Sequence, residues 1–212
     1  MIIVVASAHD PRARDLVAYW GSQCATLLAA EDLSRSGWVL EVPKRAGGRC
    51  VAGRQIWPDK AITGVLTLRP RIFAEELAHV AAADRGYVAA EMTAVLRTWL
   101  AMLRCPVINP PSNASLAGPN WRAPRWRDTA ADLGLPLADQ GSEGGDVIVV
   151  GGQCFGTSDP QRARGAAALA CAAGTALMGC RFTLDGRFIS ATPWPALDWP
   201  GVRDRLRELL AG

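Results

Sequence analysis

The order of hydrophobic and polar positions predicts short buried strands that alternate with helices in the first part of the chain. Residues 1–6 form an uninterrupted apolar run that ends at small polar residues, as a buried parallel strand does. Asp10 can cap a helix that has Pro11 at its first position and that continues to about Trp20. Further strands are expected at residues 24–28, 62–68 and 105–109. This alternation favours an α/β sheet.

The most strongly periodic helix is expected at residues 86–104. Its apolar positions keep helical spacing at Val88, Met92, Val95, Leu96, Trp99 and Leu103. Another helix is expected to begin near Phe73. Ahead of it, Gly47-Gly48 predicts the turn of a hairpin that joins residues 38–42 to 49–57.

The last third of the chain changes character, with two hairpins and two helices. Gly151-Gly152 is flanked by residues 146–150 and 153–155, and Asp185-Gly186 is flanked by 182–184 and 187–190. Helices are expected at 160–174 and 201–210, and one more at 124–133 precedes the hairpins. The polar, unpatterned residues 138–145 mark the expected boundary between an α/β lobe, 1–137, and a small α+β lobe, 146–212.

Composition and charge exclude several classes of function. The net charge of +3 is too small to indicate nucleic-acid binding by itself, and no apolar run is long enough to span a membrane. The apolar N-terminus lacks the features of a signal peptide, so a cytoplasmic protein is expected. Six cysteines without a CxxC pair, and only His9 and His79, predict buried thiols and no metal site.

Several motifs together resemble ATP-grasp ligases of the RimK-like and microviridin-ligase-like branch. The resemblance begins at Tyr87-Val88-Ala89-Ala90-Glu91 and continues through residues 105–111 and 116–119 to 126–136. The end of the chain, from Met178-Gly179-Cys180-Arg181-Phe182 to Thr192-Pro193, is similar to the final metal-binding segment of that family. The resemblance implies a pre-ATP-grasp-like N-terminal lobe and a remnant of the ATP-grasp core. It also implies that the central nucleotide-clamping lobe is missing, because few residues separate 136 from 146.

The resemblance further implies that the ATP chemistry is lost. Family members supply lysines from the central lobe, and no lysine follows Lys60 in this chain. Acidic residues and an asparagine hold Mg²⁺ in the family's final segment, where this chain has Arg181, Ser190 and Thr192. We therefore expect no catalytic residues, no metal, no cofactor and no ATP-dependent ligase activity.

Other candidate chemistry has a structural alternative in each case. Cys154, in Gly151-Gly152-Gln153-Cys154, could be a nucleophile, or it could be an inward-facing hairpin residue without a base. His9 and Asp10 follow the first strand, where α/β sheets commonly bind ligands, but Asp10 could simply cap a helix.

Tryptophan and arginine concentrate in two segments that are candidates for peptide binding. Such side chains are favoured at peptide interfaces, although they could equally pack inside. The candidate residues are Trp121, Arg122, Arg125, Trp126, Arg127, Trp194 and Trp199.

Shortened ATP-grasp homologues occur in clusters for ribosomally synthesised, modified peptides, including crocagin-type ones, so the resemblance implies a peptide-binding accessory protein. It would present a precursor peptide to modifying enzymes of the same pathway, as a homodimer, without nucleic-acid or membrane partners. The alternative is a small peptide-modifying enzyme, either a residual ligase or a cysteine-dependent hydrolase.

Overall fold

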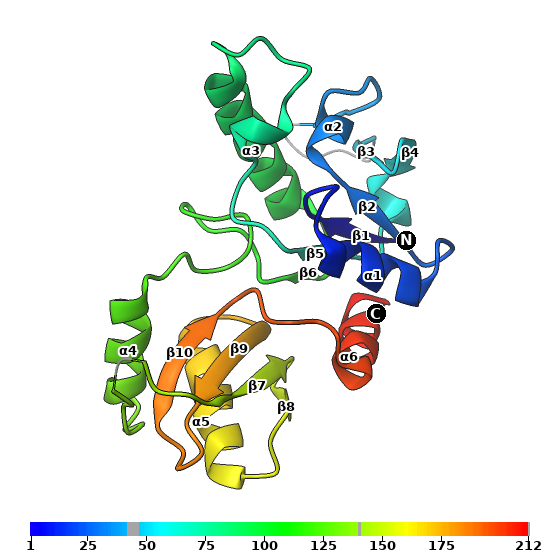
Figure 1. Cartoon of the computed structure of the whole chain (residues 1–212). Coiled ribbons are helices and arrows are strands. Elements are labelled where there is room, and N and C mark those ends of the chain that lie inside the picture. The colour runs from blue at the N-terminus through cyan, green and yellow to red at the C-terminus, as the bar shows by residue number, and fades with distance from the viewer. Residues whose placement is uncertain (42–46, 140, 212) are drawn as a thin grey trace. The chain divides into compact units, whose positions relative to one another are not determined.

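The described residues form two compact units in a computed structural model, which describes residues 1–41, 47–139 and 141–211 (Figure 1). The first unit comprises Met1–Ala117 and Arg207–Gly212, and the second comprises Gly118–Leu206. The division therefore falls after Ala117, whereas the sequence pattern placed it at 138–145. The reason is that Trp126 and Ala130 pack into the core of the second unit.

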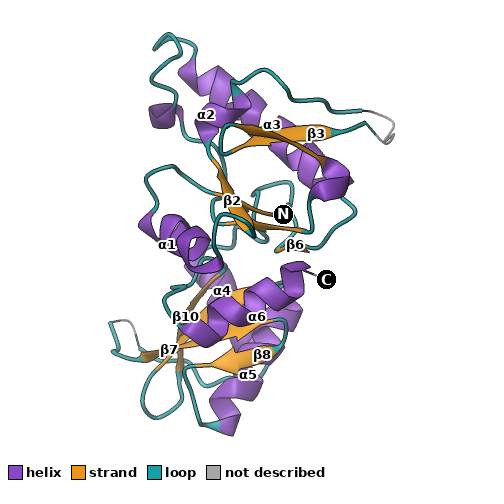
Figure 2. Ribbon diagram, turned by 90° about the vertical axis from the view of Figure 1, so that its right-hand side faces the viewer, coloured by secondary structure: helices purple, strands orange, loops and turns teal. Residues whose placement is uncertain are grey.

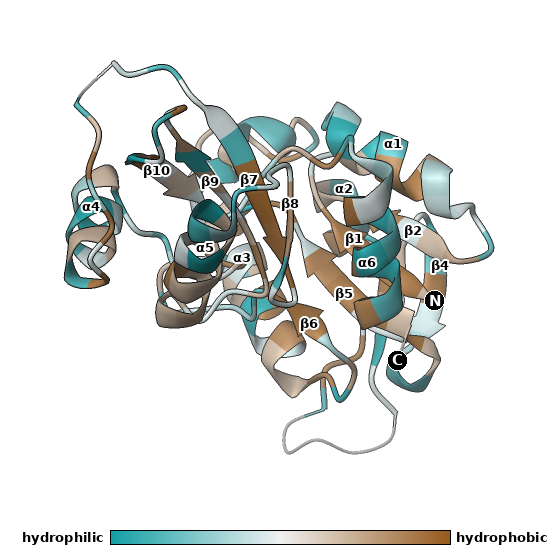
Figure 3. Ribbon diagram, turned by 90° about the horizontal axis from the view of Figure 1, so that it is seen from below, coloured by the Kyte–Doolittle hydropathy of each residue, from teal (hydrophilic) through white to brown (hydrophobic). Residues whose placement is uncertain are grey.

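The first unit is built on a parallel sheet of four strands in the order β2-β1-β5-β6. Ile2 of the central strand pairs with Ala25 on one side and with Gly64 on the other. Strands β1, β5 and β6 have the brown of hydrophobic residues in Figure 3, and β1 and β5 are buried along their whole length. Their bounds are β1 (Ile2–Val5), β2 (Ala25–Leu28), β5 (Gly64–Thr67) and β6 (Val107–Ile108).

Helices cover this sheet because alternate residues of each strand point to opposite faces. Ile3 and Val5 pack with Leu96 and Trp99 of α3 (Arg85–Met102). On the other face, Gly64 lies close to Leu210 of α6 (Pro200–Ala211). The remaining elements of the unit are α1 (Pro11–Trp20), α2 (Ala30–Leu33), the hairpin β3 (Arg49–Ala52) and β4 (Gln55–Pro58), and the 3-10 helices η1 (Asp59–Ala61) and η2 (Ala74–Glu76).

The second unit has an antiparallel sheet in the order β10-β9-β7-β8, whose strands are orange in Figure 2. Helices α4 and α5 pack on one face of it. Val147, Val149, Met178 and Cys180 point into the core on that face, which we call the core face. The opposite face is called the outer face below. The bounds are α4 (Ala123–Asp132), β7 (Gly145–Val150), β8 (Gln153–Phe155), α5 (Pro160–Ala172), β9 (Leu177–Phe182) and β10 (Phe188–Thr192).

Most predicted elements are present, and three differ. The hairpin turn lies at Gly53-Arg54, both with positive φ, while the expected strand at 38–42 forms only a bridge at Val39 and ends in residues outside the described part. The helix expected from Phe73 is a single 3-10 turn. Strand β9 begins at Leu177, five residues before the expected strand.

None of the helices in the described residues is long and apolar enough to cross a membrane.

Candidate functional site

The three positions that resemble a metal site lie together on the outer face of the second sheet. Ser190 of β10 pairs directly with Arg181 of β9, and Thr192 pairs with Gly179. Because side chains alternate along a strand, Arg181, Ser190 and Thr192 share one face. The sequence resemblance thus identified three residues that the fold brings side by side.

Arg181 is held on this face by a carboxylate from the neighbouring strand. Asp146 of β7 pairs with Arg181, and its Oδ1 lies 3.4 Å from the guanidinium Nε. The two side chains are 52% and 57% exposed, so this ion pair adds little to stability. The pair places a guanidinium and its partner carboxylate beside Ser190 on this face of the sheet.

These residues do not fit Mg²⁺. The ion prefers several oxygen ligands in octahedral geometry, and the single carboxylate of this group already pairs with Arg181. Across residues 1–41, 47–139 and 141–211, no group of three or more acidic, histidine or cysteine side chains could hold a metal ion. A guanidinium in the middle of the site would also repel a cation.

Part of the outer face is covered by residues 193–199 of the same unit. A Cβ placed on Gly179 of β9 would lie 2.9 Å from Cβ of Pro195, and one on Gly156 would lie 3.0 Å from the ring of Trp199. Leu197 in this segment is 2% exposed. The chain itself therefore packs on the sheet beside Arg181.

A second group of candidate residues surrounds the start of α4. The rings of Trp121 and Trp126 are 4.7 Å apart, and the Arg125 guanidinium lies 4.7 Å from the centre of the Trp121 ring. Trp126 is only 3% exposed, and its Nε1 donates to the carbonyl of Trp121 at 3.1 Å. Trp126 thus supports Trp121 from the core, while the exposed Arg125 and Arg122 remain accessible.

The structure does not unite the seven residues that were candidates for peptide binding. Trp121, Arg125 and Trp126 gather at α4, which packs on the core face. Trp194 is half-buried and Trp199 is exposed, and both belong to the segment that covers the outer face. Arg127, which is half-buried, lies one turn into α4.

Cys154 does not have the surroundings of an activated nucleophile. Its thiol lies 3.3 Å from the carbonyl of Ala163, to which it donates. Burial raises the pKa of Cys154 above its ordinary value, which lowers the fraction of reactive thiolate. The second unit contains no histidine, since His9 and His79 both belong to the first.

Asp10, which the sequence offered either as a ligand-binding residue or as a helix cap, is a helix cap. Its carboxylate accepts a hydrogen bond from the Arg12 backbone at 3.0 Å and caps α1. Burial raises the pKa of Asp10, but the hydrogen bonds and charge of Arg12 outweigh it, so the net pKa is lowered. His9 is exposed to solvent.

One feature of the first unit was missed by the sequence analysis. A cavity of about 430 Å³ runs beside α3, between the segment that follows β5 and the loop before Leu116. The available signal was the row of small residues on one side of α3, which the apolar periodicity of the opposite side concealed.

Comparison with known proteins gives a match at the level of structure alone. Neither the protein-family models nor the curated proteins include a match to the sequence. Among solved structures, the macrocyclase MdnC of Microcystis aeruginosa MRC, bound with the precursor peptide MdnA, has a TM-score of 0.74 at 12% identity, over 100% of this chain and 99% of that one.

Two further structures agree with this match. A Chryseobacterium gregarium RiPP-associated ATP-grasp ligase, in complex with ADP and a leader and core peptide, has a TM-score of 0.67 at 9% identity, over 99% of this chain and 96% of that one. A RimK domain ATP-grasp protein of Sphaerobacter thermophilus DSM 20745 has a TM-score of 0.53 at 13% identity, over 100% and 99%. The similarity spans the whole chain and both sheets, so this protein has the α/β fold of the ATP-grasp ligases.

Proposed function

We propose that this protein binds a ribosomally made precursor peptide without catalysing a reaction on it. The observation that carries the proposal is the Arg181–Asp146 ion pair, flanked by Ser190 and Thr192, at the positions where the resemblance places metal ligands. Phosphoryl transfer from ATP needs counter-charge on the transferred oxygens, which Mg²⁺ supplies in ligases. A site built around a guanidinium cannot collect that ion.

The connection between α4 and β7 supports the same proposal. Residues 133–144 join the two elements, and the described part of this connection contains only an isolated bridge, at Leu137. A central lobe that closes over a nucleotide would need to be inserted here, according to the family resemblance. This chain passes directly from the helix to the sheet, and no lysine follows Lys60 to meet a triphosphate.

Peptide binding is the property that would survive these losses. Two of the structurally similar ligases are described in complex with a precursor peptide or with a leader and core peptide. In this chain, Trp121 and Arg125 offer an aromatic face and a guanidinium at the start of α4, with Arg122 exposed beside them. Such groups contribute strongly to peptide recognition because they bury area and pair with carboxylates.

The proposed partners are the precursor peptide, modifying enzymes of the same pathway and a second copy of the chain, in the cytoplasm. Isothermal titration calorimetry with the precursor peptide encoded beside this gene tests the proposal. Saturable heat at micromolar peptide supports it. Absence of binding at high micromolar concentration overturns it.

A further inference from the structure

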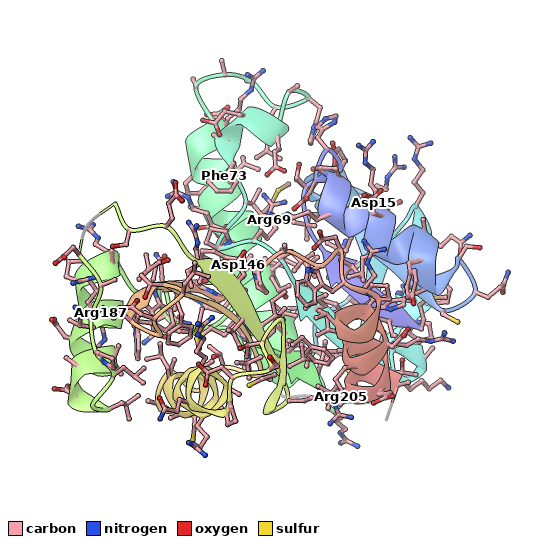
Figure 4. All side chains as sticks on the ribbon, turned by 60° about the horizontal axis from the view of Figure 1, so that its bottom comes forward. Asp15, Arg69, Phe73, Asp146, Arg187 and Arg205 are labelled. Carbon is pink, nitrogen blue, oxygen red and sulfur yellow. The ribbon has the colours of Figure 1, made fainter. Side chains whose placement is uncertain are left out.

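The cavity beside α3 in the first unit is a groove with three walls, which we call the α3 groove. One wall is the segment Pro70–Glu75, the second is one side of α3, and the third is the loop 112–116. Its volume of about 430 Å³ lies in the range of sites that hold small ligands or a few side chains. Figure 4 labels Phe73, whose side chain belongs to the first wall.

The floor of the groove is apolar and lies close to the backbone of α3. Ile72, Ala89 and Leu116 line the groove and are 3%, 5% and 0% exposed. The side of α3 that lines it carries small residues at helical spacing, which leave room for an incoming side chain. These residues are Gly86, Ala89, Ala90, Thr93 and Ala94.

Hydrogen bonds fix the walls, so the groove is already formed in the unbound chain. Thr93 Oγ1 donates to the carbonyl of Ala89 at 2.8 Å and accepts from the backbone of Ile72 at 3.0 Å. The backbone N–H of Leu116 donates to the carbonyl of Pro70 at 2.8 Å. Preformed sites bind more tightly because little conformational entropy is lost on binding.

The rim of the groove carries two guanidinium groups without a carboxylate partner. Arg71 stacks over the ring of Phe73 at 5.2 Å, and Arg97 donates to the carbonyl of Asn113 at 3.0 Å. In the described part of the chain, neither arginine forms an ion pair. Among the described lining residues Glu75 is the single carboxylate, so the rim has a net positive charge.

We propose that the α3 groove binds an acidic segment of the peptide, which inserts one bulky apolar side chain over Ala90 and sets a carboxylate against Arg71. This inference rests on the proposed peptide-binding function and adds a location and a sequence preference to it. The apolar floor would bury the inserted side chain, and an Arg–carboxylate pair would orient the segment.

A polyphosphate ligand fits the same rim less well. Glu75 lies in the same wall as Arg71, and its charge would repel a ligand with several negative charges. The apolar floor formed by Ile72 and Leu116 also offers nothing to phosphate oxygens. A single carboxylate beside an apolar side chain avoids both difficulties.

Fluorescence anisotropy with short labelled peptides that tile the precursor tests the groove. The tightest peptide is expected to place Asp or Glu next to a large apolar residue. Ala90→Trp should fill the groove and weaken that peptide by about ten-fold or more, the loss expected when a buried anchor is excluded. Arg71→Ala should weaken it by about five-fold and flatten its salt dependence.

Val95→Trp provides the matched control because Val95 is exposed on α3 outside the groove. Its affinity should stay within about two-fold of the wild type. If Ala90→Trp does not fold, as judged by circular dichroism, the exposed Arg71→Ala variant still decides the question. Tight binding that neither variant weakens overturns the groove and leaves the peptide-binding function standing. Failure of every peptide to bind the wild type overturns both.

Discussion

At the scale of single residues, the first unit contains a buried charged side chain, that of Arg69. Arg69, which Figure 4 labels, is 4% exposed. It donates to the carbonyl of Arg71 at 2.7 Å and forms an ion pair with Glu76. A buried cation is tolerated only while its partner remains, because removal of one member leaves an uncompensated charge. This pair also explains why the chain after Phe73 forms a 3-10 turn, since the Phe73 N–H donates to the same carboxylate at 3.1 Å.

Glu76→Gln should therefore lower the free energy of unfolding by about 3 kcal/mol at neutral pH. Burial raises the pKa of Glu76, but the hydrogen bond and charge of Arg69 outweigh burial, so the net pKa is lowered. The stabilisation is then fully present above the ordinary carboxyl pKa and is lost as the pH falls through the lower folded-state pKa. Urea unfolding of the wild type and the variant, at neutral pH and at a pH below the folded-state pKa of Glu76, measures the difference. Glu75→Gln is the control, because Glu75 is exposed and its substitution should change stability by less than about 0.5 kcal/mol.

The cysteines make a second prediction at this scale. Burial raises the pKa of Cys50 to about 12, with Asp59 adding to the effect, and burial raises the pKa of Cys180 to about 12 as well. Both should resist alkylation of the native protein at neutral pH, because the thiolate is the reactive form. Exposed Cys171 should react first. Peptide mapping by mass spectrometry after limited iodoacetamide treatment measures the order in which the cysteines react. Early labelling of Cys50 or Cys180 would contradict the burial of these two thiols.

At the scale of elements, the sequence predicted those helices and strands that are determined by residues close together in the chain. Asp10-Pro11 and the periodicity around α3 were sufficient, since a cap and an apolar stripe act within one helix. The turn at Gly53-Arg54 was missed because residues 49–57 were expected to form one strand, whereas they form the two paired strands β3 and β4, and Val39 also bridges Arg49. The early start of β9 at Leu177 is likewise set by its pairing with Val150.

The candidate peptide-binding residues at α4 differ in burial, since Trp126 is buried and Arg125 is exposed. Arg125→Ala should weaken peptide binding by about three-fold to ten-fold, because it removes an exposed guanidinium stacked on Trp121. Arg164→Ala removes an arginine of α5 that is also exposed, and it should leave binding unchanged. Calorimetric titration of both variants measures this, and equal losses in the two would show that only net charge matters.

The cover on the outer face makes a further prediction about β9. Gly179→Ala should lower the free energy of unfolding by about 1–3 kcal/mol, because the added methyl group would meet Pro195 at 2.9 Å. Gly145→Ala in β7 is the control, since no atom lies within 4 Å of the added carbon. Thermal unfolding followed by circular dichroism measures both. Equal stability of the two variants would mean that residues 193–199 do not pack tightly on β9.

At the scale of the whole molecule, the protein has the α/β fold of the ATP-grasp ligases, and we propose that the group around Arg181 does not assemble the metal chemistry of a ligase. The sequence resemblance predicted the fold, and the three residues it named as lost metal positions, Arg181, Ser190 and Thr192, share one face of the sheet. The role of Asp146 and the α3 groove could not be predicted in the same way. Each depends on segments far apart in the sequence that only the folded chain brings together.

The most direct test of this account is ADP release from Mg²⁺-ATP by the purified protein saturated with its precursor peptide. A coupled assay against a protein-free blank, with the peptide mass recorded from the same sample, gives both answers together. We predict no ADP above the blank and a peptide of unchanged mass. ADP release that accompanies loss of water from the peptide would contradict the account and identify the protein as a working ligase.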